Sequence, residues 1–300
     1  MITQLTFIHA LSPLHAGVGQ GAGVIDLPVA REKATGLPFL PGSSLKGTLR
    51  SQCEGDDCDS IFGTKLSDTD SNHASSVQFS DQRLLLLPVR SLAGTFAWVT
   101  SPYVLRRLLR DIADTRSDGP TSIPEVGQED CSVCDSGGDG KERSEIVITS
   151  SNKVYLEDLD LNALPDSAVT VWARWIGQQV FKNKPDWQRI FAGRLCIVHD
   201  DVFSFLLDTA TEITARIKLQ EESKTVQGGG LWYEEALPTE TILTGLVMIA
   251  PPPMAKKIDD ARISSKLAEL TGKTVQFGGK ATVGHGLCRV YLSANPNGGL

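Results

Sequence analysis

Asp26 is an isolated carboxylate in a segment whose composition suits work on a phosphodiester. Glycines alternate ahead of it: Gly17, Gly19, Gly21 and Gly23. A carboxylate can act as a general base or hold a divalent ion such as Mg²⁺, and glycines let backbone N–H groups approach a phosphate closely. A lone histidine is more often structural than catalytic, but His15 precedes this loop closely enough to join Asp26 at one phosphate. The spacing indicates a loop that presents both side chains.

A second glycine-rich segment lies near the C-terminus. It contains Gly278, Gly279, Lys280 and His285, with glycines on both sides of the histidine. Neither segment fits a nucleotide-binding motif, because Thr274 stands where a P-loop needs glycine and residues 24–28 cannot open a helix. Each glycine could simply allow a turn. Two such clusters, together with Lys46 and Arg50, favour a track for a nucleic-acid backbone.

Residues 211–220 alternate strictly between apolar and polar side chains, which predicts a strand with a basic polar face that includes Arg216 and Lys218. The return strand carries Trp232 and Tyr233. These rings could pack in the protein or stack on bases, each stack contributing roughly 1–3 kcal/mol. A long two-stranded ribbon is marginally stable alone, so it is expected to lean on the core, another subunit or a ligand.

The cysteine spacing permits a structural zinc site. Four thiols fall in two acidic stretches: Cys53, Cys58, Cys131 and Cys134. Brought together, they could bind Zn²⁺ tetrahedrally, although the wide first spacing makes the motif weak. The alternative is reduced thiols, which fits an intracellular protein better than a disulfide framework does. Cys196 and Cys288 lie in apolar runs and are expected in the core.

Charge is unevenly distributed along the 300 residues. The formal net charge is −7, but residues 53–73 carry −5 and residues 111–145 carry −7, which leaves +5 on the rest of the chain. The acidity therefore belongs to two predicted insertions, and the body is basic enough to face a polyanion. With 41% apolar residues, disorder of the whole chain is excluded. The absence of an apolar leader or long apolar run predicts a cytoplasmic protein that does not bind membranes.

The elements that must position these residues predict an α+β fold in one domain, residues 1–300. Ser43 or Ser44 is expected to cap a helix that carries Lys46 and Arg50, and residues 195–207 are expected to form a strand with Asp200 and Asp201. Insertions rich in loops are predicted at about 51–76 and 114–168. The further expected elements are strands at 3–9, 77–89 and 241–250, helices at 101–112, 169–181 and 258–270, and the ribbon at about 211–232.

Six runs of this sequence resemble the backbone RAMP subunits of type III-B (Cmr) CRISPR effector complexes. They are LSPLHAGVGQGAGVIDLPVAREKATGLPFLPGSSLKGTLR, CDSIFG, FSDQRLLLLPVRS, FAWVTSPYVLRRLL, LWYEEALP and FGGKATVGHGLCRV. The resemblance extends from Leu11 to Tyr291. It implies an RRM-like (ferredoxin-like) palm with finger insertions and a β-ribbon thumb, stacked as several copies along a CRISPR guide RNA beside other Cmr subunits.

The resemblance also implies a metal-dependent endoribonuclease that cuts complementary target RNA at regular intervals. Asp26 stands at the position of the family's catalytic aspartate, His15 at that of a histidine near the scissile site, and Glu234 at that of an acid near the active site. The residues that match the helix holding guide phosphates are Ser44, Lys46, Gly47 and Arg50. Ala236 replaces a family tyrosine, so no role for that tyrosine carries over.

Two other classes of function stay open at this point. The first is a scaffold that coats guide RNA without cutting, because one acid is a sparse active site. The second is a zinc-dependent hydrolase, which needs histidine or cysteine ligands near Asp26.

Overall fold

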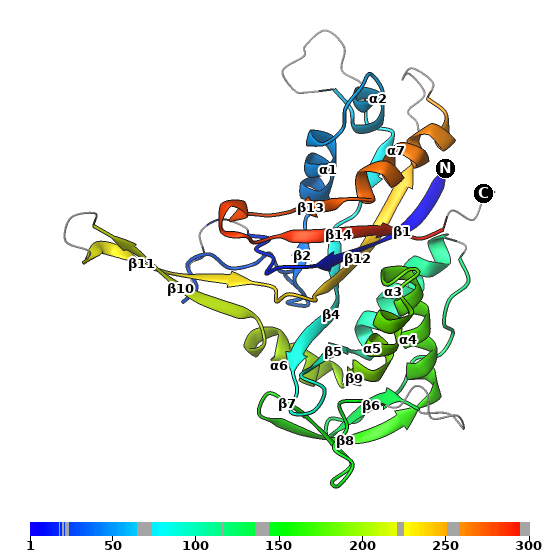
Figure 1. Ribbon diagram of the computed structural model, residues 1–300. Helices are drawn as coiled ribbons and strands as arrows, with labels where there is room; N and C mark the ends of the chain where they lie inside the picture. Colours follow the sequence, from blue (N-terminus) through cyan, green and yellow to red (C-terminus); the bar gives the residue numbers. More distant parts are fainter. Residues whose placement is uncertain are drawn as a thin grey trace.

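The computed structural model describes residues 1–17, 19, 21, 24–64, 74–115, 117–135, 144–220, 225–250 and 258–294, with only the backbone given for residues 226–228. It is an α+β body from which one long ribbon projects (Figure 1). This confirms the predicted fold class.

The body is built on a large mixed sheet. Its main path runs β13 (Thr274–Gln276), β14 (Leu287–Leu292), β1 (Ile2–Ala10), β12 (Ile242–Ile249), β4 (Gln82–Arg90), β5 (Phe96–Thr100), β9 (Leu195–Val198), β6 (Asp130–Cys134), β8 (Leu159–Asp166) and β7 (Lys153–Leu156). Two short strands join it at the side, β2 (Phe39–Leu40) on β4 and β3 (Val77–Phe79) on β12. Strand β1 is antiparallel to both of its neighbours, β12 and β14. The two ends of the sequence therefore meet in one palm, which matches the predicted RRM-like arrangement.

Two amphipathic helices cover the palm. Helix α3 (Pro102–Thr115) contacts β1, β4 and β12, and α4 (Ser167–Val180) contacts β1 and β14. Helix α3, which was predicted at 101–112, buries an apolar stripe that includes Leu105 and Leu108. Trp172 of α4 is fully buried, so it is a core residue and cannot stack on a base. Helix α5 (Pro185–Arg194) packs on α4 and β5.

The predicted strand at residues 195–207 is partly wrong. Strand β9 ends at Val198, and α6 (Asp200–Thr209) begins two residues later. Asp200 and Asp201 fall in the first helical turn, where negative charge is favoured by the helix dipole, and the Nδ1 of His199 accepts a hydrogen bond from the N–H of Asp201. The paired aspartates are thus a helix-start signal.

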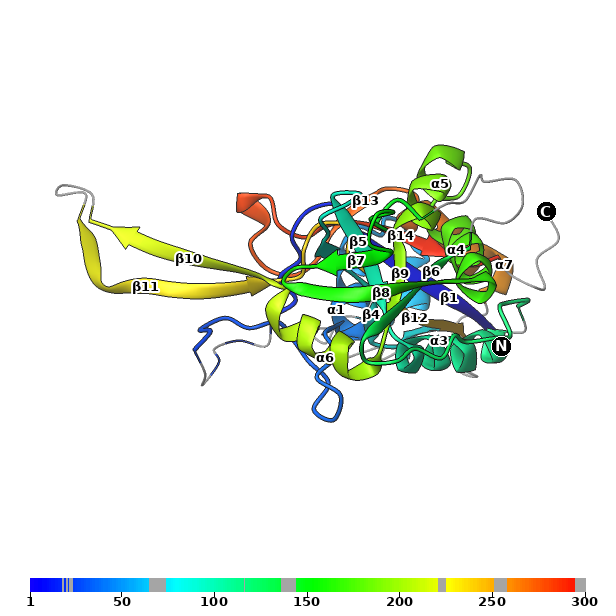
Figure 2. The ribbon, with the colours of Figure 1, turned by 90° about the horizontal axis from the view of Figure 1, so that it is seen from below.

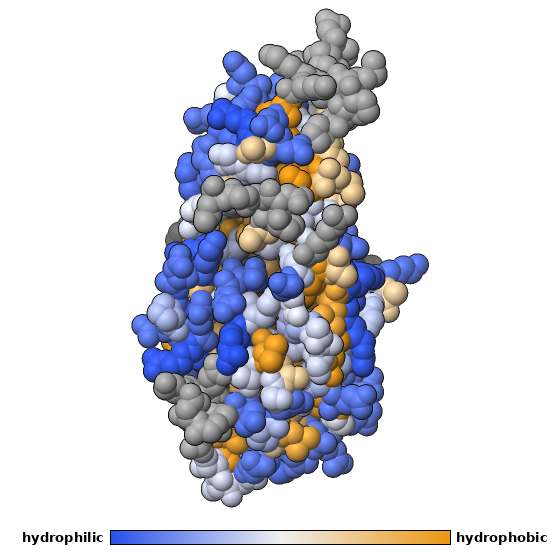
Figure 3. Space-filling model, turned by 90° about the vertical axis from the view of Figure 1, so that its right-hand side faces the viewer, coloured by the Kyte–Doolittle hydropathy of each residue, from blue (hydrophilic) through white to orange (hydrophobic). Residues whose placement is uncertain are grey.

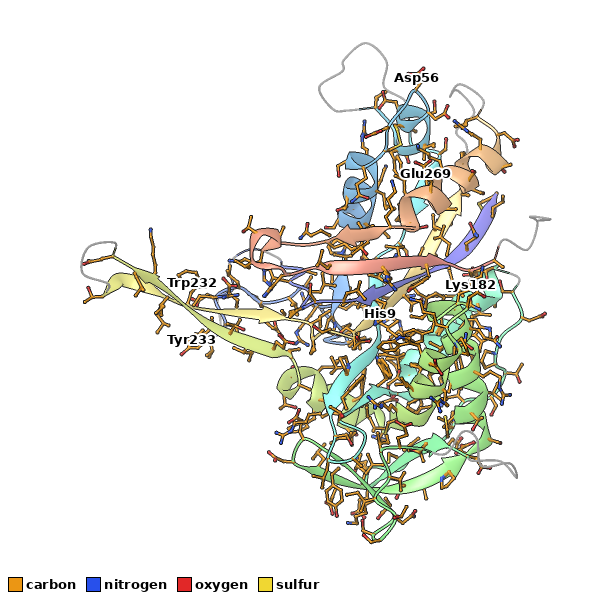
Figure 4. The ribbon with its side chains drawn as sticks, in the orientation of Figure 1. His9, Asp56, Lys182, Trp232, Tyr233 and Glu269 are labelled. Carbon is orange, nitrogen blue, oxygen red and sulfur yellow. A yellow bond between two sulfur atoms is a disulfide. The ribbon has the colours of Figure 1, made fainter. Side chains whose placement is uncertain are left out.

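The second insertion is more ordered than its composition indicates. Within residues 114–168, β6, β7 and β8 extend the main sheet, with Cys131, Val133 and Val154 fully or almost fully buried. The prediction missed these strands because they are short and the loops around them are polar and rich in glycine, so the average composition of the segment resembles that of a loop. In the first insertion, α2 (Cys58–Phe62) follows α1 (Gly42–Ser51), and Asp56 lies at the far end of the body from the β6–β8 layer (Figure 4).

The predicted thumb ribbon is present as β10 (Glu212–Leu219) and β11 (Val226–Ala236), a separate two-stranded sheet. Figure 2 shows it extending well beyond the rest of the body. The register pairs Ile217 with Leu231 and Arg216 with Trp232, so apolar and polar side chains separate onto opposite faces. Ile213, Ile217 and Leu231 are each more than half exposed. The ribbon's apolar face therefore has no cover from the described part of this chain.

On the side of the body opposite the ribbon, hydrophilic residues cover most of the visible surface and apolar residues interrupt them (Figure 3). Across the described residues, no helix combines the length and apolar character needed to cross a membrane.

Candidate functional site

A pocket of about 490 Å³ opens where three segments meet at the base of the ribbon. These segments are the N-terminal loop (residues 11–38, between β1 and β2), strand β11, and the C-terminal loop (residues 277–286, between β13 and β14). Among the described residues, its lining consists of Gly21, Asp26, Leu27, Gly229, Leu231, Trp232 and Lys280. Segments more than 200 residues apart in the sequence thus share one cavity. Its described lining contains one carboxylate, that of Asp26, and one amino group, that of Lys280.

Asp26 is exposed but held in position. Its Oδ2 accepts a hydrogen bond from the backbone N–H of Tyr233 at 2.8 Å. The next residue, Leu27, continues the attachment, since its N–H donates to the carbonyl of Tyr233 and its carbonyl accepts from the N–H of Glu235. Within the described residues, Oδ1 of Asp26 makes no hydrogen bond, so this oxygen is available to a ligand.

Glu234 is the buried centre of a charged cluster beside the pocket. Its Oε1 accepts hydrogen bonds from the Nζ of Lys280 and the Nε1 of Trp232, each at 2.6 Å, and its Oε2 accepts from the Nε of Arg216 at 3.3 Å. Burial raises the pKa of Glu234, but the bonds from Lys280, Trp232 and Arg216 outweigh it and leave the pKa below its usual value. Glu234 is therefore a fully engaged anion that joins the ribbon to Lys280.

Lys280 is presented by a tightly packed loop. Its backbone has φ +67°, in the left-handed region that non-glycine residues rarely adopt. A Cβ on Gly278 would lie 2.2 Å from the carbonyl oxygen of His15, and the N–H of Gly279 donates to that same oxygen. Glycine at position 278 thus allows the C-terminal loop to lie directly on the N-terminal loop.

The structure places His15 behind the pocket. Its side chain is buried, and Nδ1 donates a 2.6 Å hydrogen bond to the carbonyl of Glu235. A Cβ on Gly17 would lie 2.5 Å from Nε2 of this ring, so the glycine makes room for the imidazole. His15 is absent from the described lining of the pocket. Its contacts brace the N-terminal loop against β11 and the C-terminal loop.

The other predicted glycines and His285 have local roles that the structure makes visible. A Cβ on Gly21 would lie 2.7 Å from the carbonyl of Ile25, so this position needs glycine for a close approach. Gly19 has φ +96° and open space around it. His285 is partly buried, and its Nδ1 has no hydrogen-bond partner within the described residues.

The predicted phosphate-binding residues of α1 lie outside the pocket lining. Arg50 donates to Asp59 at 3.0 Å and to the carbonyl of Thr64, so it already joins α1 to α2. Burial and the nearby Arg50 lower the pKa of Lys46, whose ammonium makes no hydrogen bond within the described residues. Ser44 is half-buried and Gly47 exposed on the same helix. Helix α1 begins after Pro41 without a side-chain cap, so the expected serine cap is wrong.

The ribbon distributes its predicted contacts over two faces. Arg216 is directed to Glu234, whereas Lys218 is exposed. Trp232 and Tyr233 follow each other on β11 and project to opposite sides of the ribbon (Figure 4). Trp232 is half-buried against Glu234 and Tyr233 is 39% exposed, so Tyr233 offers the more accessible ring.

Glu235 and Arg31 also belong to the site, although neither was among the predicted site residues. Glu235 is only 2% exposed, and its carboxylate accepts hydrogen bonds from the N–H of Val29 and the guanidinium of Arg31. The signal that could have found Glu235 is its position beside Glu234 in a strand, because successive side chains face opposite ways.

The predicted four-cysteine zinc site is wrong. Cys53 and Cys58 form a disulfide, which also overturns the expectation of reduced thiols there. Cys131 and Cys134 are buried in β6, far along the sheet from α2. No group of three or more potential metal ligands occurs in the described part of the chain. Cys196 and Cys288 are buried in strands, as expected.

Comparison with known proteins accounts for this arrangement of palm, ribbon and glycine loops. Residues 7–289 match the RAMP superfamily. The chain belongs to this superfamily. As a RAMP protein it is 35% identical to "CRISPR system Cmr endoribonuclease Cmr4" of Pyrococcus furiosus, across all of this chain and 98% of the relative. It therefore groups with the Cmr4 proteins.

Solved structures agree with this assignment. An oligomeric Cmr4 from Pyrococcus furiosus superposes with a TM-score of 0.75 at 30% identity, over 98% of each chain. A subunit of the type III-B Cmr-beta complex bound to cognate target RNA superposes with a TM-score of 0.72 over 97% of each chain. At 20% identity, the second likeness bears on the fold alone.

Proposed function

We propose that this RAMP protein is the endoribonuclease backbone subunit of a type III-B CRISPR effector in the cytoplasm. It binds CRISPR guide RNA, assembles with further copies of itself in a helical filament and with other Cmr subunits, and cuts complementary target RNA at regular intervals. The observation that carries this proposal is Asp26, fixed through one carboxylate oxygen and open through the other in a pocket shared with Lys280. The relative's name as an endoribonuclease and the oligomeric relative support it.

The cut follows from bringing a ribose 2′-hydroxyl into line with its own 3′-phosphate. The ribbon splays one target nucleotide, and its 2′-oxygen attacks the adjacent phosphorus while the bond from phosphorus to the 5′-oxygen breaks. Asp26 takes the proton from the 2′-hydroxyl through Oδ1, and water returns a proton to the 5′-oxygen. The products are a 2′,3′-cyclic phosphate and a 5′-hydroxyl. Alignment of this kind can contribute several kcal/mol toward the barrier.

Lys280 stabilises the negative charge that builds on the phosphate oxygens. Its ammonium is kept at the pocket wall by Glu234, which also holds Trp232 and Arg216. An ammonium that is already in place needs no reorganisation as charge develops, which is the main source of electrostatic catalysis.

The pocket also fits a Mg²⁺ ion. Mg²⁺ is commonly bound by one or two carboxylates together with substrate phosphates and water, and Asp26 offers one free carboxylate oxygen in an open pocket. Asp26 would hold the ion through Oδ1 in place of taking the proton there, and the ion, when bound, would stabilise the phosphate charge.

A guide-binding scaffold without catalytic activity is the second candidate function. It is favoured by the pocket's composition, because Asp26 is the one carboxylate among its described lining residues. On this alternative, another subunit performs the cut.

The test is Asp26→Asn in the complex assembled with guide RNA. We expect target binding to persist and cutting to fall by at least ~10²-fold, the usual range for losing a general base. Asp158→Asn is the matched control, since Asp158 is an exposed acid on the β7–β8 turn and leaves the pocket intact. Cutting at the wild-type rate by Asp26→Asn would favour the scaffold.

A further inference from the structure

Three consecutive residues of the ribbon strand hold the two loops of the pocket. The backbone of Tyr233 binds the carboxylate of Asp26, the side chain of Glu234 binds Lys280, and the side chain of Glu235 binds Arg31. Because successive side chains of a strand face opposite ways, Glu234 serves the C-terminal loop and Glu235 the N-terminal loop. Tyr233 marks this part of the ribbon in Figure 4.

The Glu235 side of this arrangement is buried and fully used. Oε2 accepts the N–H of Val29 at 2.9 Å, and Oε1 accepts the Nη2 of Arg31 at 2.6 Å. The Glu235 side chain is 3% exposed and the Arg31 side chain 23%. A charged hydrogen-bonded pair at this depth is stronger and more rigid than a surface pair.

Arg31 extends the contact to two further segments. Its Nη2 also donates to the carbonyl of Leu207 in α6, and its Nη1 donates to the carbonyl of Gly36 at 3.1 Å. The guanidinium thus ties the N-terminal loop to the helix that precedes the ribbon and to the ribbon's return strand. A planar fork of donors suits such a junction, which a lysine ammonium cannot reproduce.

We propose that Glu235 and Arg31 form a clamp that positions Asp26 for the cut and couples it to the ribbon. Val29 is three residues from Asp26, and the backbone bonds of Leu27 to β11 lie between them. Without the clamp, residues 28–31 lose their attachment to β11 and keep backbone bonds within the N-terminal loop, such as that from the N–H of Ala30 to the carbonyl of Ala16. Asp26 then keeps its own contacts to β11 at positions 26 and 27. Glu235 and Arg31 are positioning residues, since neither is in the described pocket lining.

The inference rests on the proposed function, so its test includes Asp26→Asn beside Glu235→Gln in the assembled complex. The glutamine has the same shape but can accept only one of the two hydrogen bonds. Asp111→Asn is the matched control, because Asp111 is a buried acid bound to Arg83 and contacts no residue of 26–31. Single-turnover cutting at saturating target RNA, target binding and melting temperature are measured for each variant.

We expect Glu235→Gln to cut at least ~10-fold more slowly with target binding changed less than ~3-fold, because a small misplacement of a catalytic group is costly. The cutting rate of Glu235→Gln should fall by the same factor at every pH. Loss of a general base would instead change the pH dependence of the rate. Deuterium exchange at the Val29 N–H should accelerate. Asp111→Asn should cut normally despite a comparable loss of stability.

Wild-type cutting by Glu235→Gln, with Asp26→Asn inactive, would overturn the clamp and leave the proposed function intact. Wild-type cutting by Asp26→Asn would instead overturn the proposed function. If Glu235→Gln fails to assemble, Arg31→Lys decides by the same criteria, because it keeps the charge and removes the fork. The clamp proposal is then overturned if Arg31→Lys cuts at the wild-type rate and its Val29 N–H exchanges with deuterium as slowly as in the wild type.

Discussion

The carboxylate of Asp26 is fixed by the backbone of Tyr233, with 2.8 Å between Oδ2 and the amide nitrogen, although 207 residues separate them in the sequence. A backbone donor serves here whatever side chain occupies position 233. The ring of Tyr233 is thereby left free on the ribbon face. A movement of β11 at Tyr233 would therefore move the carboxylate of Asp26 with it.

Replacing the 2′-hydroxyl at the scissile nucleotide of the target by hydrogen should abolish cutting at that site. The proposed attack uses this oxygen as its nucleophile, and nothing else in the target can form the cyclic phosphate. The measurement is the ladder of cut lengths on a target RNA with one 2′-deoxy nucleotide. Sites with intact 2′-hydroxyls serve as internal controls. Continued cutting at the substituted site would refute the scheme.

Glu234→Gln should lower the free energy of unfolding by about 2 kcal/mol at neutral pH, because it removes charged hydrogen bonds to Lys280 and Arg216. The pKa of Glu234 is lowered in the folded state, so its stabilisation is present above the ordinary value of 4.5 and is lost as pH falls below it. Denaturant unfolding at several pH values checks this. The difference between wild type and variant should shrink below pH 4.5.

A pH-independent difference between wild type and Glu234→Gln would contradict the assigned charge. Lys266 and Glu269 supply a control, because this pair lies within α7 (Asp260–Thr271), away from the pocket, and its carboxylate is exposed (Figure 4). Glu269→Gln should change stability far less than Glu234→Gln does, because a solvent-screened ion pair contributes little.

Local patterns predicted the ribbon and the helices, because their signal is contained within a few residues. The alternation from Ile213 to Leu219 has period two, and it forms β10 as expected. The same local reading failed at Asp200 and Asp201, where a helix start follows a short strand. The local pattern also failed for Cys53 and Cys58. Two neighbouring thiols form a disulfide and four form a zinc site, and only the fold decides how many thiols meet.

The pocket itself depends on register between distant segments. Asp26 was selected from its neighbours and the family resemblance, but its contact with β11 has no local signal. Glu235 could not be distinguished from Glu234 without knowing which face of the strand meets which loop. His15 was predicted to join Asp26 at one phosphate, but its burial and its hydrogen bond to the carbonyl of Glu235 place it among the bracing contacts.

Gly278→Ala should lower the melting temperature considerably more than Gly284→Ala. Both glycines have positive φ, at +71° and +82°, so both substitutions carry the left-handed penalty of about 1–2 kcal/mol. Only the Cβ at position 278 would meet another atom, the carbonyl oxygen of His15 at 2.2 Å, whereas position 284 has open space. Thermal unfolding is measured for both variants. The difference between their melting-temperature shifts reports the clash between the added Cβ at position 278 and the carbonyl of His15. Equal shifts would show that the two loops are not in contact.

Lys46→Met should weaken guide-RNA binding and reduce the magnitude of its salt dependence by about one unit in the slope of log K against log [salt], as expected for one lost phosphate contact. Lys46 is the cation of α1 without a hydrogen bond in the described residues, whereas Arg50 is engaged by Asp59. Binding is measured at four or more salt concentrations. Lys153→Met is the control, because Lys153 pairs with Asp160 at the opposite end of the sheet. An unchanged slope for Lys46→Met would show that Lys46 of α1 does not contact a phosphate of the guide RNA.

Cys53→Ser should destabilise the oxidised protein by about 2 kcal/mol, the value expected for opening a loop of this length. The disulfide closes the turn between α1 and α2, where Arg50 also reaches Asp59. Thermal unfolding is compared with and without a thiol reductant. Reduction should bring the wild-type melting temperature down to that of the variant and leave the variant unchanged. A wild-type protein that is insensitive to the reductant, with both cysteines titrating as free thiols, would show that the bridge does not form in solution.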